Sequence, residues 1–402
     1  MRVAQCVRAL WETGRDVFLR GDLVRLFGGG GRAAGPSSGW PATACSSGRA
    51  GASTSSPTRA CPRARRTGST ASPRPSAEAS GSSRAWSRRG SVVDLGGVRH
   101  EGVVFAVDEA SRRPDWPWLD AARGVRKVEF VDDVRPASAR GMFSGLYSLE
   151  SVAGAGRLDL SRCSDASEMF WGCSSLEAID VSGWDTGRIA SAIGMFDACS
   201  SLAALDVSRW DVRSLATATD MFRDCRSLAA LDVSRWDVGM LEDASCMFDG
   251  CRSLEAIDVS GWDTGRLRGA SGMFNDCRSL AALDVSRWDV GRLEEATEMF
   301  RSCSSLATLD VSRWDVRSLA NASWMFDGCR SLSSLDVSRW DVGRLAGAIG
   351  MFNDCSSLAS IDVSRWDTGS LERTDYMFDG CPAGAGASMA LPGRDEAERD
   401  ER

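Results

Sequence analysis

Residues 195–220 read MFDACSSLAALDVSRWDVRSLATATD, and this pattern recurs from residue 142 to residue 381. A Met-Phe pair begins each unit, every 26 residues after a first step of 27. The pairs begin at Met142, Met169, Met195, Met221, Met247, Met273, Met299, Met325, Met351 and Met377. A fixed period of this length is typical of a solenoid, in which each unit buries its apolar face against its neighbours. The sequence therefore predicts a stack of similar units.

The first half of the unit matches the skeleton of a leucine-rich repeat. Leu202, Leu205 and Val207 stand at i, i+3 and i+5, and Trp follows in the slot that usually holds Asn or Cys. Side chains alternate across a strand, so Leu205 and Val207 are expected to face inward and Asp206 outward. This half is therefore predicted to be a short strand of a parallel sheet.

The second half places apolar residues at helical spacing. Leu215, Ala218 and Met221, with the Phe and Cys that follow, fall on one face of a helix. Ser214 precedes them as an expected N-cap. The predicted fold class is therefore an α/β solenoid, a leucine-rich-repeat-like right-handed coil of strand–turn–helix units with a parallel sheet on one wall.

Cysteine and tryptophan follow the same period. Cysteine recurs from Cys173 to Cys381 and tryptophan from Trp184 to Trp366. No C-x-x-C pair occurs, which removes the usual zinc spacing. Buried cysteine packs as a small hydrophobic residue and stacked tryptophan buries a large area, so both columns are predicted to be core. The alternatives are a metal or disulfide column and an aromatic binding platform.

Composition excludes several classes of function. The 402 residues carry a net charge of −7, which does not favour nucleic acid or an anionic membrane as the partner. No apolar run approaches the ~18 residues of a membrane-spanning helix. His100 is the single histidine, the glycines 28–31 lack the Lys-Ser/Thr of a phosphate loop, and no G-x-S-x-G elbow occurs. We therefore expect a non-enzymatic protein without a cofactor and without a transmembrane segment.

The chain is uneven along its length. Residues 28–91 hold ten Arg and one acid, Glu78, among Gly, Ser, Ala and Pro, a composition that cannot offset the entropy of ordering. Two short strands are expected at 103–107 and 125–131. The predicted organisation is a short amphipathic helix of unknown role (1–27), a disordered segment (28–91), a small β-rich cap (92–141), the solenoid (142–381) and an acidic disordered tail (382–402).

A line of carboxylates is predicted along the sheet wall, and it is the candidate binding face. It comprises Asp180, Asp206, Asp232, Asp258, Asp284, Asp310, Asp336 and Asp362. The candidate binding face also includes the arginines that precede six of the eight tryptophans, Arg209, Arg235, Arg287, Arg313, Arg339 and Arg365. A second acidic column follows each tryptophan, from Asp185 to Asp367, and residues 142–381 hold 22 Arg against 37 acids, a net charge of −15.

Like charges about 5 Å apart repel, so the acidic columns need compensation. Hydrogen bonds to turn amides, pairing with the arginines, and binding of a cation such as calcium or of a basic partner remain open at this point.

The motif Met-Phe-x-x-Cys-x-Ser-Leu-x-x-Leu-Asp-Val-Ser-x-Trp-Asp resembles the BspA-like leucine-rich-repeat proteins. More specifically, residues 125–381 look like the domain of unknown function first described in mycoplasma surface lipoproteins, in the form found in protists. The slot three residues before Met-Phe, usually Met in that family, holds small residues such as Ala192 and Ala218. The resemblance implies surface display and protein binding. The N-terminal region shows no signal-peptide core, which by itself favours the cytoplasm.

The sequence thus predicts a repeat protein that mediates protein–protein interaction or adhesion through its acidic sheet wall. The partner is an unidentified protein, and a basic one fits the charge best. The alternative is a structural protein of the cell surface or covering whose carboxylate columns are stabilised by cations; divalent-cation dependence separates the two.

Overall fold

A computed structural model describes residues 91–95, 99–101, 124–130 and 133–382. The chain divides after Gly81 into two units, and every described residue belongs to the second, residues 82–402. The predicted helix at 1–27, the predicted strand at 103–107, the acidic tail beyond Pro382 and all but the last residue of the segment 28–91 lie outside the described residues.

A small sheet begins the described part. β1 (Ser91–Leu95), β2 (Arg99–Glu101), β3 (Val125–Phe130) and β4 (Ser151–Ala153) form one sheet in the order β2-β1-β3-β4. β1 is antiparallel to both β2 and β3, whereas β3 and β4 are parallel. β3 buries Val125, Val128 and Phe130, so the strand predicted at 125–131 is confirmed. Ser151 of β4 bridges to Ala178 in the parallel sense, which joins this sheet to the repeats.

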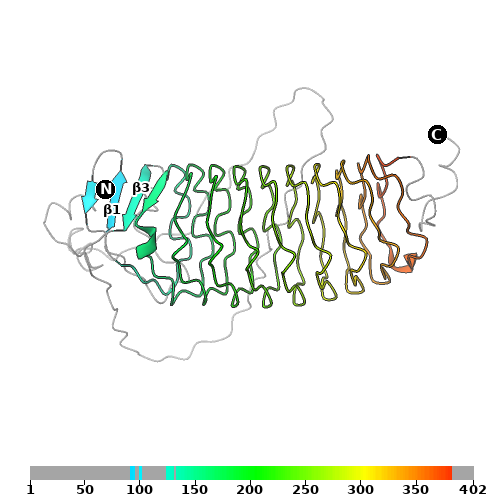
Figure 1. Ribbon diagram of the computed structural model, residues 1–402, viewed down its shortest axis with the longest axis horizontal. Helices are drawn as coiled ribbons and strands as arrows, with labels where there is room; N and C mark the ends of the chain where they lie inside the picture. Colours follow the sequence, from blue (N-terminus) through cyan, green and yellow to red (C-terminus); the bar gives the residue numbers. More distant parts are fainter. Residues whose placement is uncertain (1–90, 96–98, 102–123, 131–132, 383–402) are drawn as a thin grey trace, which may run out of the picture. The chain divides into compact units, whose positions relative to one another are not determined.

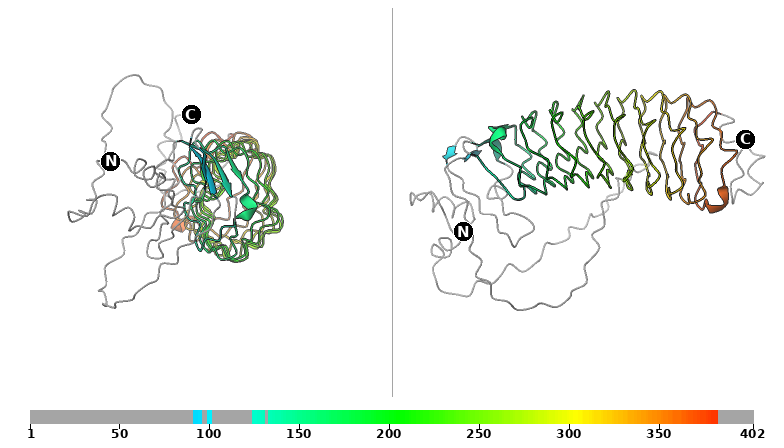
Figure 2. Two further views of the ribbon diagram at one scale, coloured as in Figure 1. Left: turned by 90° about the vertical axis from the view of Figure 1, so that its left-hand side faces the viewer. Right: turned by 60° about the horizontal axis from the view of Figure 1, so that its bottom comes forward.

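The repeats form a solenoid of stacked 26-residue coils, as the period predicts (Figure 1). Seen along the stack, successive coils superimpose around a common interior (Figure 2). Parallel bridges join residues 26 apart, for example Ala256 to Ala282. Two short 3-10 turns, η2 (Ala155–Arg157) and η3 (Thr368–Ser370), lie near the two ends of the repeats. None of the described segments is a helix long and apolar enough to cross a membrane.

The predicted helix in each repeat is wrong: the described residues contain no α-helix. Two residues per coil have left-handed φ, Gly194 (59°) and Ala198 (60°) in one coil and Asp220 (56°) and Asp224 (52°) in the next. Left-handed residues interrupt a right-handed helix. Ser214 does not cap a helix; its Oγ donates instead to the carbonyl oxygen of Gly187 in the preceding coil (2.7 Å).

The Met-Phe wall, residues 191–198 and their equivalents, is built from hydrogen bonds between coils. Alternate backbone N–H groups, those of Ala192, Gly194, Phe196 and Ala198, donate to carbonyls of the next coil at 2.8–3.0 Å. The intervening N–H groups close turns within the coil, as from Met195 to Ala192 (3.2 Å). The same offsets that suggest a helix face therefore bury Met and Phe inside a tightly bonded coil.

The predicted parallel sheet is reduced to single bridges. On the Asp wall, residues 202–208 and their equivalents, the ladder of bridges is broken between Ala204 and Ala230 and ends at Thr308. An unbroken ladder runs instead through the half predicted as helix, from Asp165 to Arg373. The sheet prediction is thus right about parallel stacking and wrong about the wall that carries the continuous ladder.

The cysteine and tryptophan columns are core, as predicted. Tryptophan rings of adjacent coils stack at centroid distances of 6.1–6.4 Å, and each Nε1 donates to a carbonyl of the preceding coil, as from Trp210 to Val181 (3.1 Å). Phenylalanine rings stack beside them, with Phe248 5.7 Å from Phe222. Cys199 donates its Sγ–H to the carbonyl of Phe170 (3.2 Å), and burial raises the pKa of Cys329 to about 12.

Candidate interaction groove on the Asp wall

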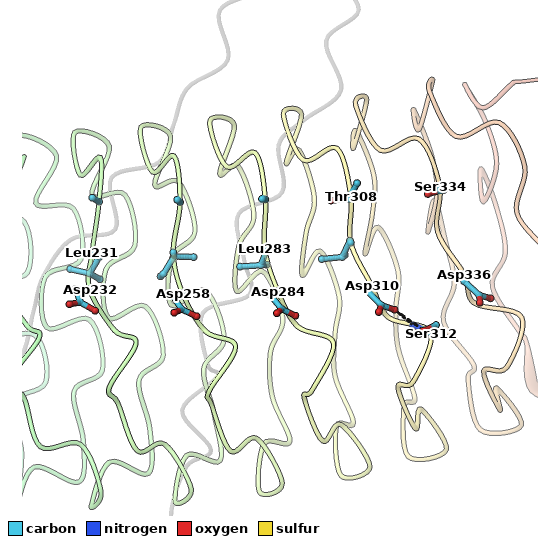
Figure 3. Close-up of a pocket in the computed structure, with 15 residues that line it drawn as sticks. Leu231, Asp232, Asp258, Leu283, Asp284, Thr308, Asp310, Ser312, Ser334 and Asp336 are labelled. Atoms are coloured by element: carbon cyan, nitrogen blue, oxygen red, sulfur yellow. Dashed lines mark hydrogen bonds between the residues drawn. The ribbon is translucent and has the colours of Figure 1, made fainter.

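An open groove runs along the Asp wall. One stretch of about 920 Å³ is lined by coils from Ala230 to Asp336, and a second of about 650 Å³ runs from Val152 to Ala230. The two stretches share Ala230, so the groove follows most of the wall. Figure 3 shows the carboxylates succeeding one another from coil to coil along it.

Most coils contribute a small residue, a Leu or Ile and an Asp to the groove. In the coil of Asp258, the small residue Ala256 and the edge of Ile257 lie beside the carboxylate. The small residue is alanine in the early coils and becomes Thr308 and Ser334 toward the C-terminal end. The floor is therefore lined by small and apolar side chains, with one carboxylate per coil along its side.

All eight predicted aspartates are exposed, and serine fixes each of them. Asp206 Oδ1 accepts from both the N–H (3.1 Å) and the Oγ–H (2.6 Å) of Ser208. The other seven repeat this geometry, with N–H distances of 3.0–3.1 Å and Oγ–H distances of 2.7 Å. Among the alternatives left open by the sequence, hydrogen bonding to turn groups is thus what the structure contains. The carboxylates are held in one orientation.

These hydrogen bonds stabilise the ionised form of the aspartates. The side-chain and backbone bonds from Ser208 lower the pKa of Asp206, and the equivalent serines lower that of Asp232 and Asp284. The same direction and leading cause hold for Asp180, Asp310, Asp336 and Asp362. Most of the column is therefore charged at neutral pH.

Ion pairing of the arginine column with these aspartates, another of the alternatives left open by the sequence, does not occur within the described residues. Arg209, Arg235, Arg287, Arg313, Arg339 and Arg365 are all exposed, and none lies within 4.0 Å of a carboxylate of the described residues. Serine donates to the aspartate directly, whereas Arg209 makes only a minor electrostatic contribution that lowers the pKa of Asp206. Seven of the eight aspartates line the groove, whereas Asp362 and the six arginines of the predicted binding face are not among its lining residues.

The second acidic column serves the turns after each tryptophan. Asp211 Oδ1 accepts from the N–H of Arg213 (3.2 Å), and all eight members accept from the residue two positions on at 3.0–3.3 Å. Arg213 and Arg317 also grip Asp211 and Asp315 through two guanidinium nitrogens each. None of these aspartates lines the groove.

Sequence reasoning missed one polar column, on the Met-Phe wall. It consists of the third residue of each coil and includes Arg223, Asp249, Asn275, Arg301 and Asp327. Asp249 and Asp327 are each only 7% exposed. The available signal was variation: this position changes from coil to coil while the apolar positions around it do not.

The described residues contain no group of three or more His, Cys, Asp or Glu side chains arranged to hold a metal ion. Adjacent aspartates of the Asp wall contribute one carboxylate per coil, each already engaged by serine.

Comparison with known proteins identifies a family. Residues 137–257, 205–308, 228–335 and 295–384 match the family model described as "Mycoplasma protein of unknown function, DUF285". The match supports the mycoplasma part of the resemblance; the BspA-like and protist assignments stay predictions. No curated protein matches the chain.

Two solved structures illustrate the likeness of this chain to known folds. The complex of TLR13 with ssRNA13 aligns at 15% identity and a TM-score of 0.25, covering 57% of this chain and 38% of that one. A leucine-rich-repeat protein from Leptospira interrogans aligns at 11% identity and a TM-score of 0.23, covering 63% and 66%. The chain thus spans less than two thirds of either structure.

Proposed function

We propose that this chain, which belongs to the family described as Mycoplasma protein of unknown function, DUF285, is a non-enzymatic repeat protein that binds a basic segment of another protein in the groove of the Asp wall. The observation that carries the proposal is the groove itself, in which each coil presents an exposed carboxylate fixed by serine. A solenoid with a repeated surface is commonly used for such recognition.

Fixed carboxylates reduce the entropic cost of binding. A side chain already held in its bound orientation loses little freedom when a partner arrives. Neighbouring coils of a parallel stack are about 4.8 Å apart, so an extended partner meets a carboxylate at every coil. Several weak contacts on one partner then add to a useful affinity.

The partner's chemistry follows from the groove's sides and floor. Carboxylates along the side favour lysine or arginine, whereas Ala256 and Ala282 on the floor leave room for an extended backbone with small side chains. The exposed arginine column lies outside the residues that line the groove, so the groove itself is acidic.

The test compares two sets of substitutions in the full-length chain. The groove variant carries Asp206→Asn, Asp232→Asn, Asp258→Asn and Asp284→Asn. The control variant carries Asp211→Asn, Asp237→Asn, Asp263→Asn and Asp289→Asn in the same coils. Both remove four charges, and asparagine keeps the Oδ1 acceptor that each turn needs.

The probe is a fluorescein-labelled Lys-Ala copolymer peptide, measured by anisotropy beside a Glu-Ala peptide of equal length. We expect the groove variant to weaken Lys-Ala binding at least about tenfold and the control less than about threefold, with affinity falling as salt rises. Equal weakening by both variants, or no preference for the basic peptide, contradicts the proposal.

A second candidate function is a cation-stabilised structural protein of the cell surface. The observation that favours it is that Oδ2 of each groove aspartate makes no hydrogen bond within the described residues. Calcium prefers carboxylate oxygens, and an ion that binds only the folded state raises the melting temperature. A rise with millimolar calcium in the native chain, absent in the groove variant, would support this function over peptide binding.

A further inference from the structure

The polar column on the Met-Phe wall has its own order. From the N-terminal end, the third residue of successive coils is Trp171, Asp197, Arg223, Asp249, Asn275, Arg301, Asp327, Asn353 and Asp379. The sequence Arg-Asp-Asn thus occurs twice, with equivalent residues 78 positions apart, which is three coils. We call these two sets the triads.

Within each triad the aspartate carboxylate contacts the arginine of the preceding coil and the asparagine of the following coil. Asp249 Oδ2 lies 3.2 Å from Arg223 Nε, and its Oδ1 accepts from Asn275 Nδ2 at 2.8 Å. Asp327 repeats this geometry, with Arg301 Nε at 2.8 Å and Asn353 Nδ2 at 2.7 Å. Both oxygens of each carboxylate are therefore committed to specific neighbours.

The triads are largely withdrawn from water. The side chains of Asp249 and Asp327 are 10% and 11% exposed, and those of Arg223 and Arg301 are 18% and 21% exposed. An acid from the same wall flanks each arginine, Asp220 at 3.4 Å and Glu298 at 3.2 Å. Removing one partner of such a pair leaves a buried charge without compensation, which is strongly unfavourable.

The apolar columns are nearly identical in every coil, so they do not specify the order in which the coils pack. Phe, Cys and Trp recur at every coil, so a coil packed on the wrong neighbour would bury nearly the same apolar surface. The triads differ from coil to coil, and a single buried polar residue is known to fix register in coiled coils at some cost in stability.

We propose that the triads specify which coil packs on which, and that three coils rather than one is the unit in which this array can gain or lose length while every triad contact is kept. Deleting three coils, residues 221–298, places Arg301 after Asp197 and reproduces the native order. Deleting one coil gives an outcome that depends on which coil is removed.

Two single-coil deletions in the otherwise complete chain test this. Deletion of 221–246 removes Arg223 and packs Asp197 against Asp249, two half-buried or buried acids. Deletion of 273–298 removes Asn275 and places Asp249 between Arg223 and Arg301. Both remove 26 residues and share the Met, Phe, Cys, Leu, Val and Trp core positions, so they are closely matched in buried apolar surface; they differ at the last residue, Cys246 in one and Glu298 in the other.

We expect the deletion of 221–246 to melt about 10 °C below the deletion of 273–298. The deletion of 221–298 should melt above that of 221–246 although it lacks two more coils. Equal losses in both single-coil deletions, including failure of both to fold, would overturn the proposal, because stability would then depend only on the number of coils.

A pair of substitutions keeps the test independent of deletions. Arg223→Met removes the triad arginine, and Arg226→Met removes an arginine of the same coil that is 52% exposed and pairs with Asp224. We expect a drop of about 10 °C for Arg223→Met and less than about 2 °C for Arg226→Met. Equal small drops would contradict a register role for the triads.

Discussion

The two walls of the solenoid share one period but differ in how their coils are joined. On the Met-Phe wall, four backbone hydrogen bonds of 2.6–3.0 Å connect each coil to the next. On the Asp wall there is at most one such bond per coil, as from Ala307 to Ala281 at 3.3 Å. The backbone hydrogen bonds that join coil to coil are therefore concentrated on the Met-Phe wall. The Asp wall has few of them and exposes its side chains.

This difference explains where sequence variation is found. The Asp wall repeats Leu-Asp-Val-Ser with few changes, because each aspartate needs its serine and each apolar residue its place in the core. The Met-Phe wall keeps Met, Phe and Cys but varies the positions between them, where left-handed turns and the triads lie. The exposed side chains of the Asp wall are thus nearly the same in every coil, whereas the residues that differ between coils lie on the Met-Phe wall.

The largest expected effect comes from the core of the Met-Phe wall. Phe248 is fully buried and stacks between Phe222 and Phe274. Phe248→Ala is expected to reduce the free energy of unfolding by about 4 kcal/mol, measured by urea denaturation followed by tryptophan fluorescence. Ala256→Ser, exposed in the groove of the same coil, should change it by less than about 0.5 kcal/mol. Similar losses of unfolding free energy in the two variants would contradict this difference between the walls.

A pH dependence is expected from the Met-Phe wall next. Burial, with a smaller contribution from Asp220, raises the pKa of Asp197 to about 7, against the opposing effects of Arg223 and the Trp171 Nε1–H (2.9 Å). Between pH 4 and 7 the folded state holds a proton that the unfolded state releases, so stability falls as pH rises through this window. We expect a loss on the order of 2 kcal/mol between pH 5 and 8.

Asparagine in place of Asp197 provides the control. Asp197→Asn keeps an acceptor for the Trp171 Nε1–H and removes the titration of Asp197, while Asp249, whose pKa burial also raises to about 7, still titrates. Urea midpoints at pH 5 and pH 8 should therefore lie closer together than in the native chain without coinciding. An unchanged difference between the two midpoints would show that Asp197 is not the group responsible.

Smaller effects are expected at the left-handed positions. Gly250 has a φ of 73°, and a Cβ there would meet Asp224 Oδ1 at 2.7 Å, so Gly250→Ala should cost about 1–2 kcal/mol. Ala198 occupies the same place in an earlier coil with a φ of 60°, so Ala198→Gly should be neutral or stabilise by up to about 1 kcal/mol. Thermal melts check both; a destabilising Ala198→Gly would mean that its methyl packing outweighs the backbone strain.

The smallest effect on stability is expected on the Asp wall. Ser234→Ala removes the Oγ–H that donates to Asp232 at 2.7 Å and should raise the pKa of Asp232 toward its ordinary value. Because the site is exposed, the free energy of unfolding should change by less than about 0.5 kcal/mol. Carbon-detected NMR titration reports the pKa, with Asp284 as the unaltered reference. An unshifted Asp232 would show that the backbone bond alone holds it.

The exposed line of aspartates followed from the sequence, whereas the groove beside it did not. Alternation placed Leu205 and Val207 inside and Asp206 outside, and the 26-residue period aligned the equivalents of Asp206 along one wall. The arginine pairing did not follow, because a serine two residues away competes with Arg209 for the same carboxylate and reaches it at 2.6 Å. Whether such a local hydrogen bond forms depends on the backbone conformation, which the numbers of acidic and basic residues in the sequence do not give.

The sequence by itself determined that the chain is a solenoid, which residues are core and which aspartates form an exposed column. These follow from period and alternation, since any stack of near-identical units must bury the same positions in each. Only the tertiary structure decided that the Met-Phe half is not helical. There the N–H groups of alternate residues find carbonyls in the next coil, and a donor bonded between coils is not available for the i−4 bond of a helix.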